Sequence, residues 1–170
     1  MTAKQRNFLH QLYLSLYDFL VIYARSTLPN AALAEEAVQE AFAIAYGRAE
    51  QICSSPDAKK QLIAITSSVI RDTEERHKAA RALLLELRQS HTGLSDLSDT
   101  PRDLRILYGN LADTEEFLLV YAMAIEGKSR LQLAKQFGIS VDACKVREQQ
   151  AIKFLQNKNK FVSPFSGEST

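Results

Sequence analysis

The sequence predicts an all-α protein of two small helical domains joined by a flexible linker, the C-terminal domain containing a helix-turn-helix. Glycine and proline are scarce, with 6 and 4 among 170 residues, and apolar residues recur at helical spacing with hardly any strand-like alternation. Residues 90–103, SHTGLSDLSDTPRD, are rich in Ser, Asp, Gly and Pro, which is typical of a linker. We therefore expect a first domain over residues 1–89, the linker over 90–103, a second domain over 104–160 and a C-terminal tail over 161–170.

Three helices are expected in the first domain. The first spans residues 5–26, and its apolar face consists of Leu9, Leu12, Leu16, Phe19, Leu20 and Tyr23. Pro29 and Asn30 mark the break before a second helix over residues 31–50, whose inner stripe consists of Ala34, Val38, Ala41, Phe42 and Ala45. The sequence SSPD, residues 54–57, predicts a turn before a third helix over residues 59–89. The inner residues of that third helix are Leu62, Ile65, Val69 and Ile70.

The second domain is expected to begin with helices over residues 102–108 and 114–125, the latter capped by Asp113 and Glu116 in a capping box. The stretch LQLAKQFGISVDACKVREQQAIKFLQ, residues 131–156, then predicts two helices joined at Gly138. A steep helix crossing needs small residues and a backbone that can take left-handed angles. Ala134 suits the crossing, Gly138 suits the turn and Ser140 can cap the second helix. These features favour a helix-turn-helix, and an ordinary helical hairpin is the alternative.

A local excess of basic residues surrounds this helix pair. The whole chain carries a net charge of only +1, but residues 128–160 contain eight Lys and Arg against Asp142 and Glu148. Such an excess is expected of a surface that binds phosphates. A solvated basic helix is the alternative.

Glu148 interrupts the apolar stripe of the second helix of this pair. That stripe follows helical spacing through Val141, Cys144, Glu148, Ala151 and Leu155. Because a buried unpaired carboxylate is costly, Glu148 must reach solvent at the edge of the stripe or pair with a cation. Lys145 shares its face, and Arg130 is the candidate from the preceding helix. We expect Glu148 to orient its partner towards a phosphate, and Glu148→Leu to preserve or raise stability.

Catalysis finds no support in the sequence. His10, His77 and His91 stand alone, and no Gly-rich phosphate loop or nucleophile motif is present. Cys53 and Cys144 are too far apart in sequence to form a metal motif, and reduced thiols in a cytoplasmic protein explain them best. No run of about 18 apolar residues occurs, so we expect no membrane insertion. Neither an enzyme nor a metal or other cofactor is predicted.

Three stretches resemble the ECF (extracytoplasmic function) sigma factors, two-domain members of the sigma-70 family of bacterial RNA polymerase specificity subunits. They are AEEAVQEAF at residues 34–42, AITSSVIRDTEER at 64–76 and EGKSRLQLAKQFGISVDACKVREQQAIKFL at 126–155. The first is similar to region 2.2 of that family and the last to region 4.2, while Gln61, Ser68 and Glu75 depart from the family pattern. The resemblance implies a protein that binds core RNA polymerase and promoter DNA and directs transcription initiation, with an anti-sigma factor as a further candidate partner.

The resemblance also implies which residues meet these partners. The polymerase-binding residues would be Glu36, Gln39 and Glu40, which lie opposite the apolar stripe of their helix and form a face complementary to a basic coiled coil. The −10 promoter element would meet Arg71, Arg76, Lys78 and Arg81, with the turn at residues 54–59 capturing an unstacked base. The −35 element would be read by Lys145, Val146, Gln149 and Gln150, with phosphate contacts from Lys128, Arg130, Arg147 and Lys153.

Two other functions stay open at this point. One is a sequence-specific regulator that uses only the helix-turn-helix and does not bind polymerase. The other is a degenerate sigma-like interaction protein that sequesters partners and no longer reads DNA.

Overall fold

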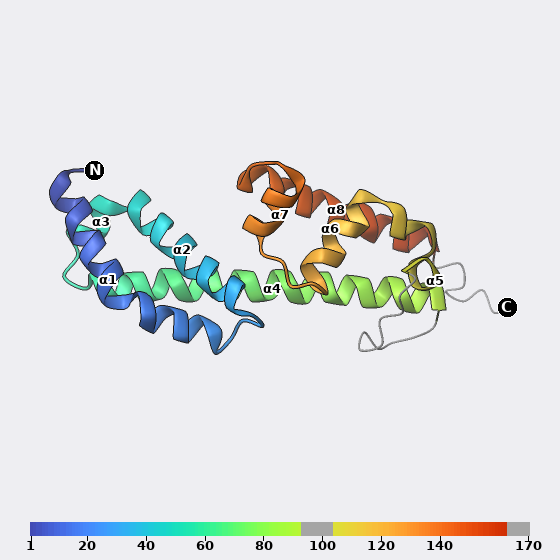
Figure 1. The fold of residues 1–170 in the computed structure, drawn as a ribbon, viewed down its shortest axis with the longest axis horizontal. Helices are drawn as coiled ribbons and strands as arrows, with labels where there is room; N and C mark the ends of the chain where they lie inside the picture. The colour runs from blue at the N-terminus through green and yellow to red at the C-terminus, as the bar shows by residue number, and fades with distance from the viewer. Residues whose placement is uncertain (93–103, 163–170) are drawn as a thin grey trace. The chain divides into compact units, whose positions relative to one another are not determined.

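A computed structural model of the chain describes residues 1–92 and 104–162, and every regular element within these two ranges is a helix (Figure 1). The predicted all-α class is therefore confirmed. By their internal contacts the residues divide into two units, Met1–Arg76 and His77–Thr170. Most of the predicted linker and tail, residues 93–103 and 163–170, lies outside the described residues.

The N-terminal unit contains α1 (Ala3–Arg25), α2 (Ala31–Gly47), α3 (Ala49–Cys53) and the first part of α4 (Ala58–Thr92). Helices α1 and α2 lie side by side and run in opposite directions (Figure 1). Asn30 begins α2, because its side chain accepts a hydrogen bond of 2.9 Å from the Leu33 N–H. The second predicted helix, residues 31–50, is in fact two helices, because Arg48 leaves the helical region at φ −113° and ψ 28°.

The core of this unit confirms the predicted stripe of α2. All five of its members are buried: Ala34, Val38, Ala41, Phe42 and Ala45. Leu62, Val69 and Ile70 of α4 belong to the same core, and Ile65 is half-buried beside it. Most of the members of the stripe are small, so the neighbouring helices can approach α2 closely.

The predicted face of α1 is partly wrong. Phe19 is 56% exposed, whereas Val21 and Ala24 are buried. Successive residues of an α-helix point about 100° apart, so Phe19 and Leu20 cannot both face the same core. Leu20 is fully buried, and the core lies on its side of the helix.

The C-terminal unit contains the rest of α4, followed by α5 (Leu104–Tyr108), the 3₁₀-helix η1 (Gly109–Asp113), α6 (Glu115–Ala124), α7 (Arg130–Phe137) and α8 (Val141–Val162). The predicted capping box at Asp113 is wrong by one residue. Asp113 is the last residue of η1, and Thr114 takes the extended cap conformation before α6. The Thr114 hydroxyl accepts the hydrogen bond from the Phe117 N–H at 3.2 Å.

The core of the C-terminal unit includes a part of α4 that we had expected in the first domain. Its α4 members are Ala80, Leu83, Leu84 and Leu87. The contacts thus divide after Arg76, earlier than the boundary expected at residue 89. His77 is buried in this unit, with Nδ1 at 2.8 Å from the carbonyl oxygen of Met123, which indicates a packing role.

The connection between α7 and α8 follows the predicted local chemistry. Gly138 ends α7 in the left-handed region, at φ 65° and ψ 35°, and the Ile139 N–H donates to the Ala134 carbonyl at 3.0 Å. The Ser140 hydroxyl then accepts from the Ala143 N–H at 3.1 Å at the start of α8. Ala134 is buried where α7 packs on α8.

We predict that Gly138→Ala lowers the free energy of unfolding by about 1 kcal/mol, because only the left-handed backbone opposes an added Cβ. No heavy atom lies within 4 Å of that Cβ position. Gly47→Ala is the matched control, since its Cβ also meets nothing within 4 Å and its φ is not positive. This control should leave stability unchanged or raise it by up to about 1 kcal/mol. Urea denaturation of both variants decides; equal effects would contradict the role of the turn.

Candidate nucleic-acid interface

Helix α8 presents one polar face to solvent. Its buried side consists of Cys144, Glu148, Ala151 and Leu155. The residues predicted to read bases are all exposed: Lys145, Val146, Gln149 and Gln150. Lys153 follows one turn later and is also exposed. Because residues three and four apart share a helix face, Lys145, Gln149 and Lys153 form one continuous row, which we call the α8 surface together with Val146 and Gln150.

Val146 is the apolar member of the α8 surface. It is 51% exposed, although valine is usually buried. Lys145 precedes it on the helix, so an apolar contact and a hydrogen-bond donor are available within a few ångströms of each other.

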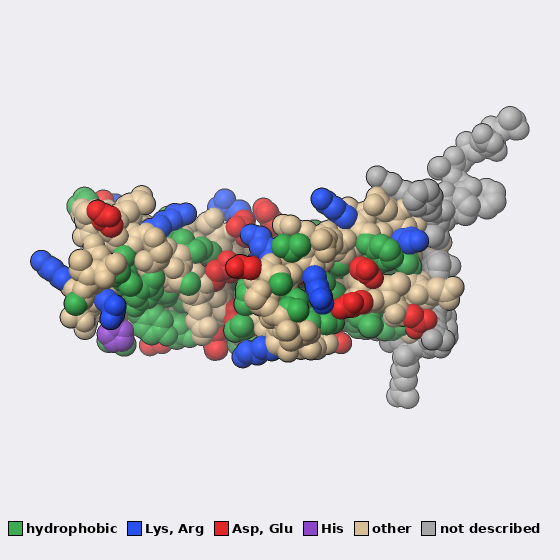
Figure 2. Space-filling view, turned by 90° about the horizontal axis from the view of Figure 1, so that it is seen from above, with side chains coloured by type: hydrophobic (Ala, Val, Ile, Leu, Met, Phe, Trp, Pro, Cys, Tyr) green, Lys and Arg blue, Asp and Glu red, His purple; other side chains and the backbone are tan. Residues whose placement is uncertain are grey.

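Carboxylates lie closer to the basic residues than the sequence suggested. Lys128 Nζ is 3.0 Å from Glu126 Oε2 and donates to Gln136 Oε1 at 2.6 Å. Arg147 is paired with Glu115, and Arg130 with Glu148. Within residues 1–92 and 104–162, no carboxylate forms an ion pair with Lys145 or Lys153. On the face drawn in Figure 2, basic and acidic side chains lie interspersed rather than in one basic patch.

The pairing of Glu148 is confirmed, and its partner is Arg130 rather than Lys145. Glu148 is 2% exposed. The Arg130 side chain, 21% exposed, donates from Nε and Nη2 to Glu148 Oε2 at 3.3 and 3.0 Å. The Cys144 thiol lies 3.8 Å from Glu148 Oε1. The pair therefore joins the first turn of α7 to the middle of α8.

This pair alters the role predicted for Arg130. Two of its guanidinium nitrogens are directed at a buried carboxylate, so they are not available to a phosphate as expected from the sequence. The capping box formed by Ser129 and Gln132 fixes the start of α7 next to it. We assign Arg130 to the packing of α7 on α8.

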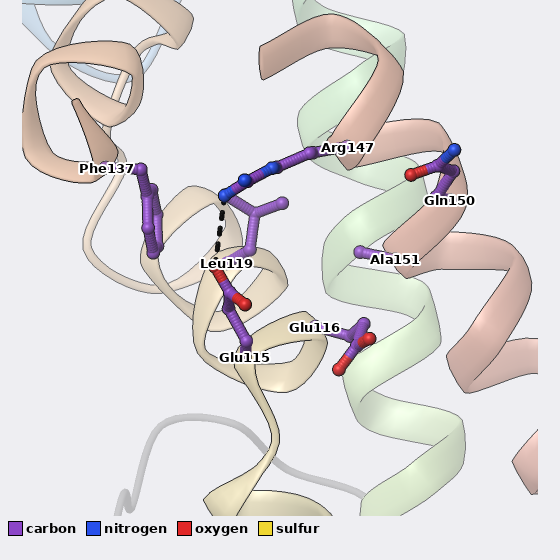
Figure 3. Close-up of a pocket in the computed structure, with 7 residues that line it drawn as sticks. All are labelled: Glu115, Glu116, Leu119, Phe137, Arg147, Gln150 and Ala151. Atoms are coloured by element: carbon purple, nitrogen blue, oxygen red, sulfur yellow. Dashed lines mark hydrogen bonds and ion pairs between the residues drawn. The ribbon is translucent and has the colours of Figure 1, made fainter. Parts of the chain in front are cut away.

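A cleft lies beside the α8 surface, between α6 and α8 and next to the end of α7 (Figure 3). Its volume is about 250 Å³. The lining residues are Glu115, Glu116, Leu119, Phe137, Arg147, Gln150 and Ala151. Arg147 extends from α8 towards α6, where Nη1 donates to Glu115 Oε1 at 3.1 Å.

Sequence reasoning missed Glu115 and Glu116 as neighbours of the candidate interface. Both lie in the first turn of α6, where carboxylates are favourable for the helix dipole. Glu115 precedes Arg147 by 32 residues. No local pattern links residues so far apart, so only the packing of α6 against α8 could place them together.

The predicted polymerase-binding residues lie on the outer face of α2. Gln39 and Glu40 are exposed, and Glu36 is half-buried. The Gln39 side chain is hydrogen-bonded to Tyr17 of α1. Burial raises the pKa of the Tyr17 hydroxyl, and the neighbouring Tyr13 adds to this effect, so Tyr17 stays neutral and can act as a hydrogen-bond partner.

The residues predicted for the −10 element are not gathered in this way. Arg71 is exposed on α4, but Arg76, five residues later, lies about 140° round the helix and is half-buried with a buried Nε atom. Lys78 and Arg81 are exposed and belong to the C-terminal unit. The turn before α4 is closed by its own bonds, including one of 3.0 Å from the Gln61 amide to the Ser55 hydroxyl.

Other kinds of site were also considered. Among the described residues, no group of three or more His, Cys, Asp or Glu side chains could hold a metal ion. Within the same ranges, no helix combines the length and apolar character needed to cross a bilayer. No protein-family model matches the chain, and no curated protein or solved structure is significantly similar to it.

We predict that Glu148→Leu destabilises the protein by about 1–3 kcal/mol, contrary to the expectation from the sequence, because it leaves the Arg130 guanidinium without its carboxylate. Arg130→Met should cost at least as much, since the abandoned Glu148 is the more deeply buried partner. The double variant should recover most of the loss, because two apolar side chains replace the pair. Urea denaturation of all three variants provides the double-mutant cycle. Additive losses would contradict a direct pairing.

Proposed function

We propose that this protein is an ECF-type sigma factor that binds core RNA polymerase and directs promoter-specific transcription initiation. The observation that carries the proposal is the α8 surface. Its side chains are exposed while the opposite side of the same helix is buried in the core. A major groove about 12 Å wide admits one α-helix, so an exposed helix face of this kind can reach base edges.

The chemistry of the α8 surface is suited to bases. Lysine can donate to O6 or N7 of guanine, and glutamine can form two hydrogen bonds with adenine. Lys145, Gln149 and Gln150 supply these groups. The exposed Val146 supplies the apolar contact that the methyl group of thymine favours. Lys153, without a carboxylate partner among the described residues, is suited to a phosphate.

The outer face of α2 supports the polymerase-binding part of the proposal. Glu36 and Glu40 lie on it with Gln39 between them, and a face of this charge favours a basic partner. A stand-alone DNA-binding regulator gives no account of this face.

A second function is favoured by the ion pairs around the α8 surface. Glu115, Glu126 and Glu148 each pair with a basic residue expected to contact DNA. Those pairs reduce the positive charge that is available for phosphates. A sigma-like protein that binds partners without reading DNA is therefore the alternative.

Two measurements separate these functions. The purified chain should co-elute with core RNA polymerase in gel filtration, and a regulator acting alone should not. The reconstituted complex should then initiate from a subset of a genomic promoter library in a runoff assay. Co-elution without promoter-specific transcripts would favour the interaction protein instead.

We predict that Glu36→Lys/Glu40→Lys weakens binding to core RNA polymerase by about 2 kcal/mol or more and slows association, because like charges would then face each other. The control is Glu50→Lys/Asp57→Lys, which makes the same charge change at exposed positions outside the α2 face. Surface-binding kinetics against immobilised core polymerase measure both variants. Equal affinities for the two variants would remove the α2 face from the interface.

We predict different effects for the two unpaired lysines of the α8 surface. Lys145→Ala should lower affinity for the preferred −35 sequence by about 1–3 kcal/mol and relax the preference at one base position. Lys153→Ala should weaken all sequences equally and reduce the salt slope by about 1. Binding titrations against single-base variants of the promoter measure both effects. A uniform loss in the Lys145 variant would show that this residue contacts only phosphate.

A further inference from the structure

The Arg147–Glu115 ion pair stands out among the pairs around the α8 surface because its two members come from different helices and are both exposed. The Arg147 side chain is 45% exposed and that of Glu115 is 65% exposed. Arg130, by comparison, is tied to a carboxylate that is 3% exposed, and its release would leave that carboxylate buried and unpaired. Lys128 is held by a local partner, Glu126, only two residues away.

We propose that Glu115 holds Arg147 away from DNA and thereby sets the number of phosphates that the α8 surface contacts. This inference rests on the proposed DNA-binding function of that surface. In the paired state, Nη1 of Arg147 is directed across the cleft to α6 (Figure 3). When the pair opens, the guanidinium is free to bind a phosphate with two parallel hydrogen bonds.

The exchange of carboxylate for phosphate is physically accessible. An ion pair between two exposed side chains contributes little stability, so thermal motion and a competing anion can open it. The cleft of about 250 Å³ beside the pair gives both side chains room to move without displacing the buried Leu119 or Ala151. The phosphate competes with the Glu115 carboxylate for the same guanidinium, and the carboxylate also repels the approaching DNA.

The test uses the full chain and a fluorescein-labelled DNA duplex, with anisotropy titrations at several salt concentrations between about 50 and 200 mM. Glu115→Gln should bind the duplex up to about fivefold more tightly at the lowest salt, the range expected for loss of an exposed ion pair. The slope of log affinity against log salt should steepen by about 0.9, the value for one additional phosphate contact on duplex DNA. A purely structural role of Glu115 would not change this slope.

Glu116→Gln is the matched control. Glu116 lines the same cleft and loses the same charge, but the ion pair of Arg147 is with Glu115. The control should raise affinity less than Glu115→Gln and leave the salt slope unchanged. In an Arg147→Gln background, Glu115→Gln should likewise leave the salt slope unchanged, because no guanidinium remains to be released.

The outcomes distinguish this inference from the proposed function. If the unmodified chain binds the duplex but the Glu115 and Glu116 variants behave alike, the role of Glu115 is overturned and DNA binding stands. If neither the unmodified chain nor any variant binds, DNA recognition by the α8 surface fails and the inference fails with it. A steeper slope in Glu115→Gln that persists after Arg147→Gln would also overturn the role, because the extra contact would come from another residue.

Discussion

The arrangement of α7 on α8 depends on the contact between Arg130 and Glu148. Both charges are largely removed from water, and such a pair is tolerated only when its geometry offsets the loss of hydration. The two nitrogen–oxygen contacts of 3.0 and 3.3 Å provide that geometry at a single carboxylate oxygen. Together with the left-handed Gly138 at the other end of α7, the pair fixes this helix against α8 at two points. The exposed face of α8 is defined as a result, because the buried carboxylate determines which side of the helix faces the core.

The electrostatic character of the C-terminal unit follows from where its carboxylates lie in space. A window along the chain gives a strong positive excess for residues 128–160, but it does not include Glu115 or Glu126. Both pair with basic residues inside that window. The free positive charge is thus concentrated on Lys145 and Lys153. Recognition by such a surface has to depend on base-edge and apolar contacts to a greater degree than on attraction to the phosphate backbone.

The sequence was a good guide wherever one local pattern decided the structure. The stripe of α2 was predicted correctly because its apolar residues leave one clear face, and the turn at Gly138 was predicted because few residues adopt that backbone. The face of α1 was partly wrong because apolar side chains occur on more than half of its circumference, so periodicity alone could not choose between Phe19 and Val21. Asp113 and Thr114 are both good caps, and only the extent of η1 decides between them. Glu115 could not be assigned at all, since its partner is defined by the packing of distant helices.

The two cysteines differ in a way that follows from the core of each unit. Cys144 has no exposed surface and is enclosed between the helices of the C-terminal unit, beside Glu148. Cys53, at the end of α3, is half-buried, with its sulfur 3.8 Å from the Gln5 carbonyl oxygen. An alkylating reagent therefore reaches the thiol of Cys53 in the native protein, whereas that of Cys144 reacts only after α8 separates from its neighbours. The native sequence thus contains its own reporter of local opening in the unit that carries the α8 surface, since the rate of Cys144 modification measures how often that core is exposed to solvent.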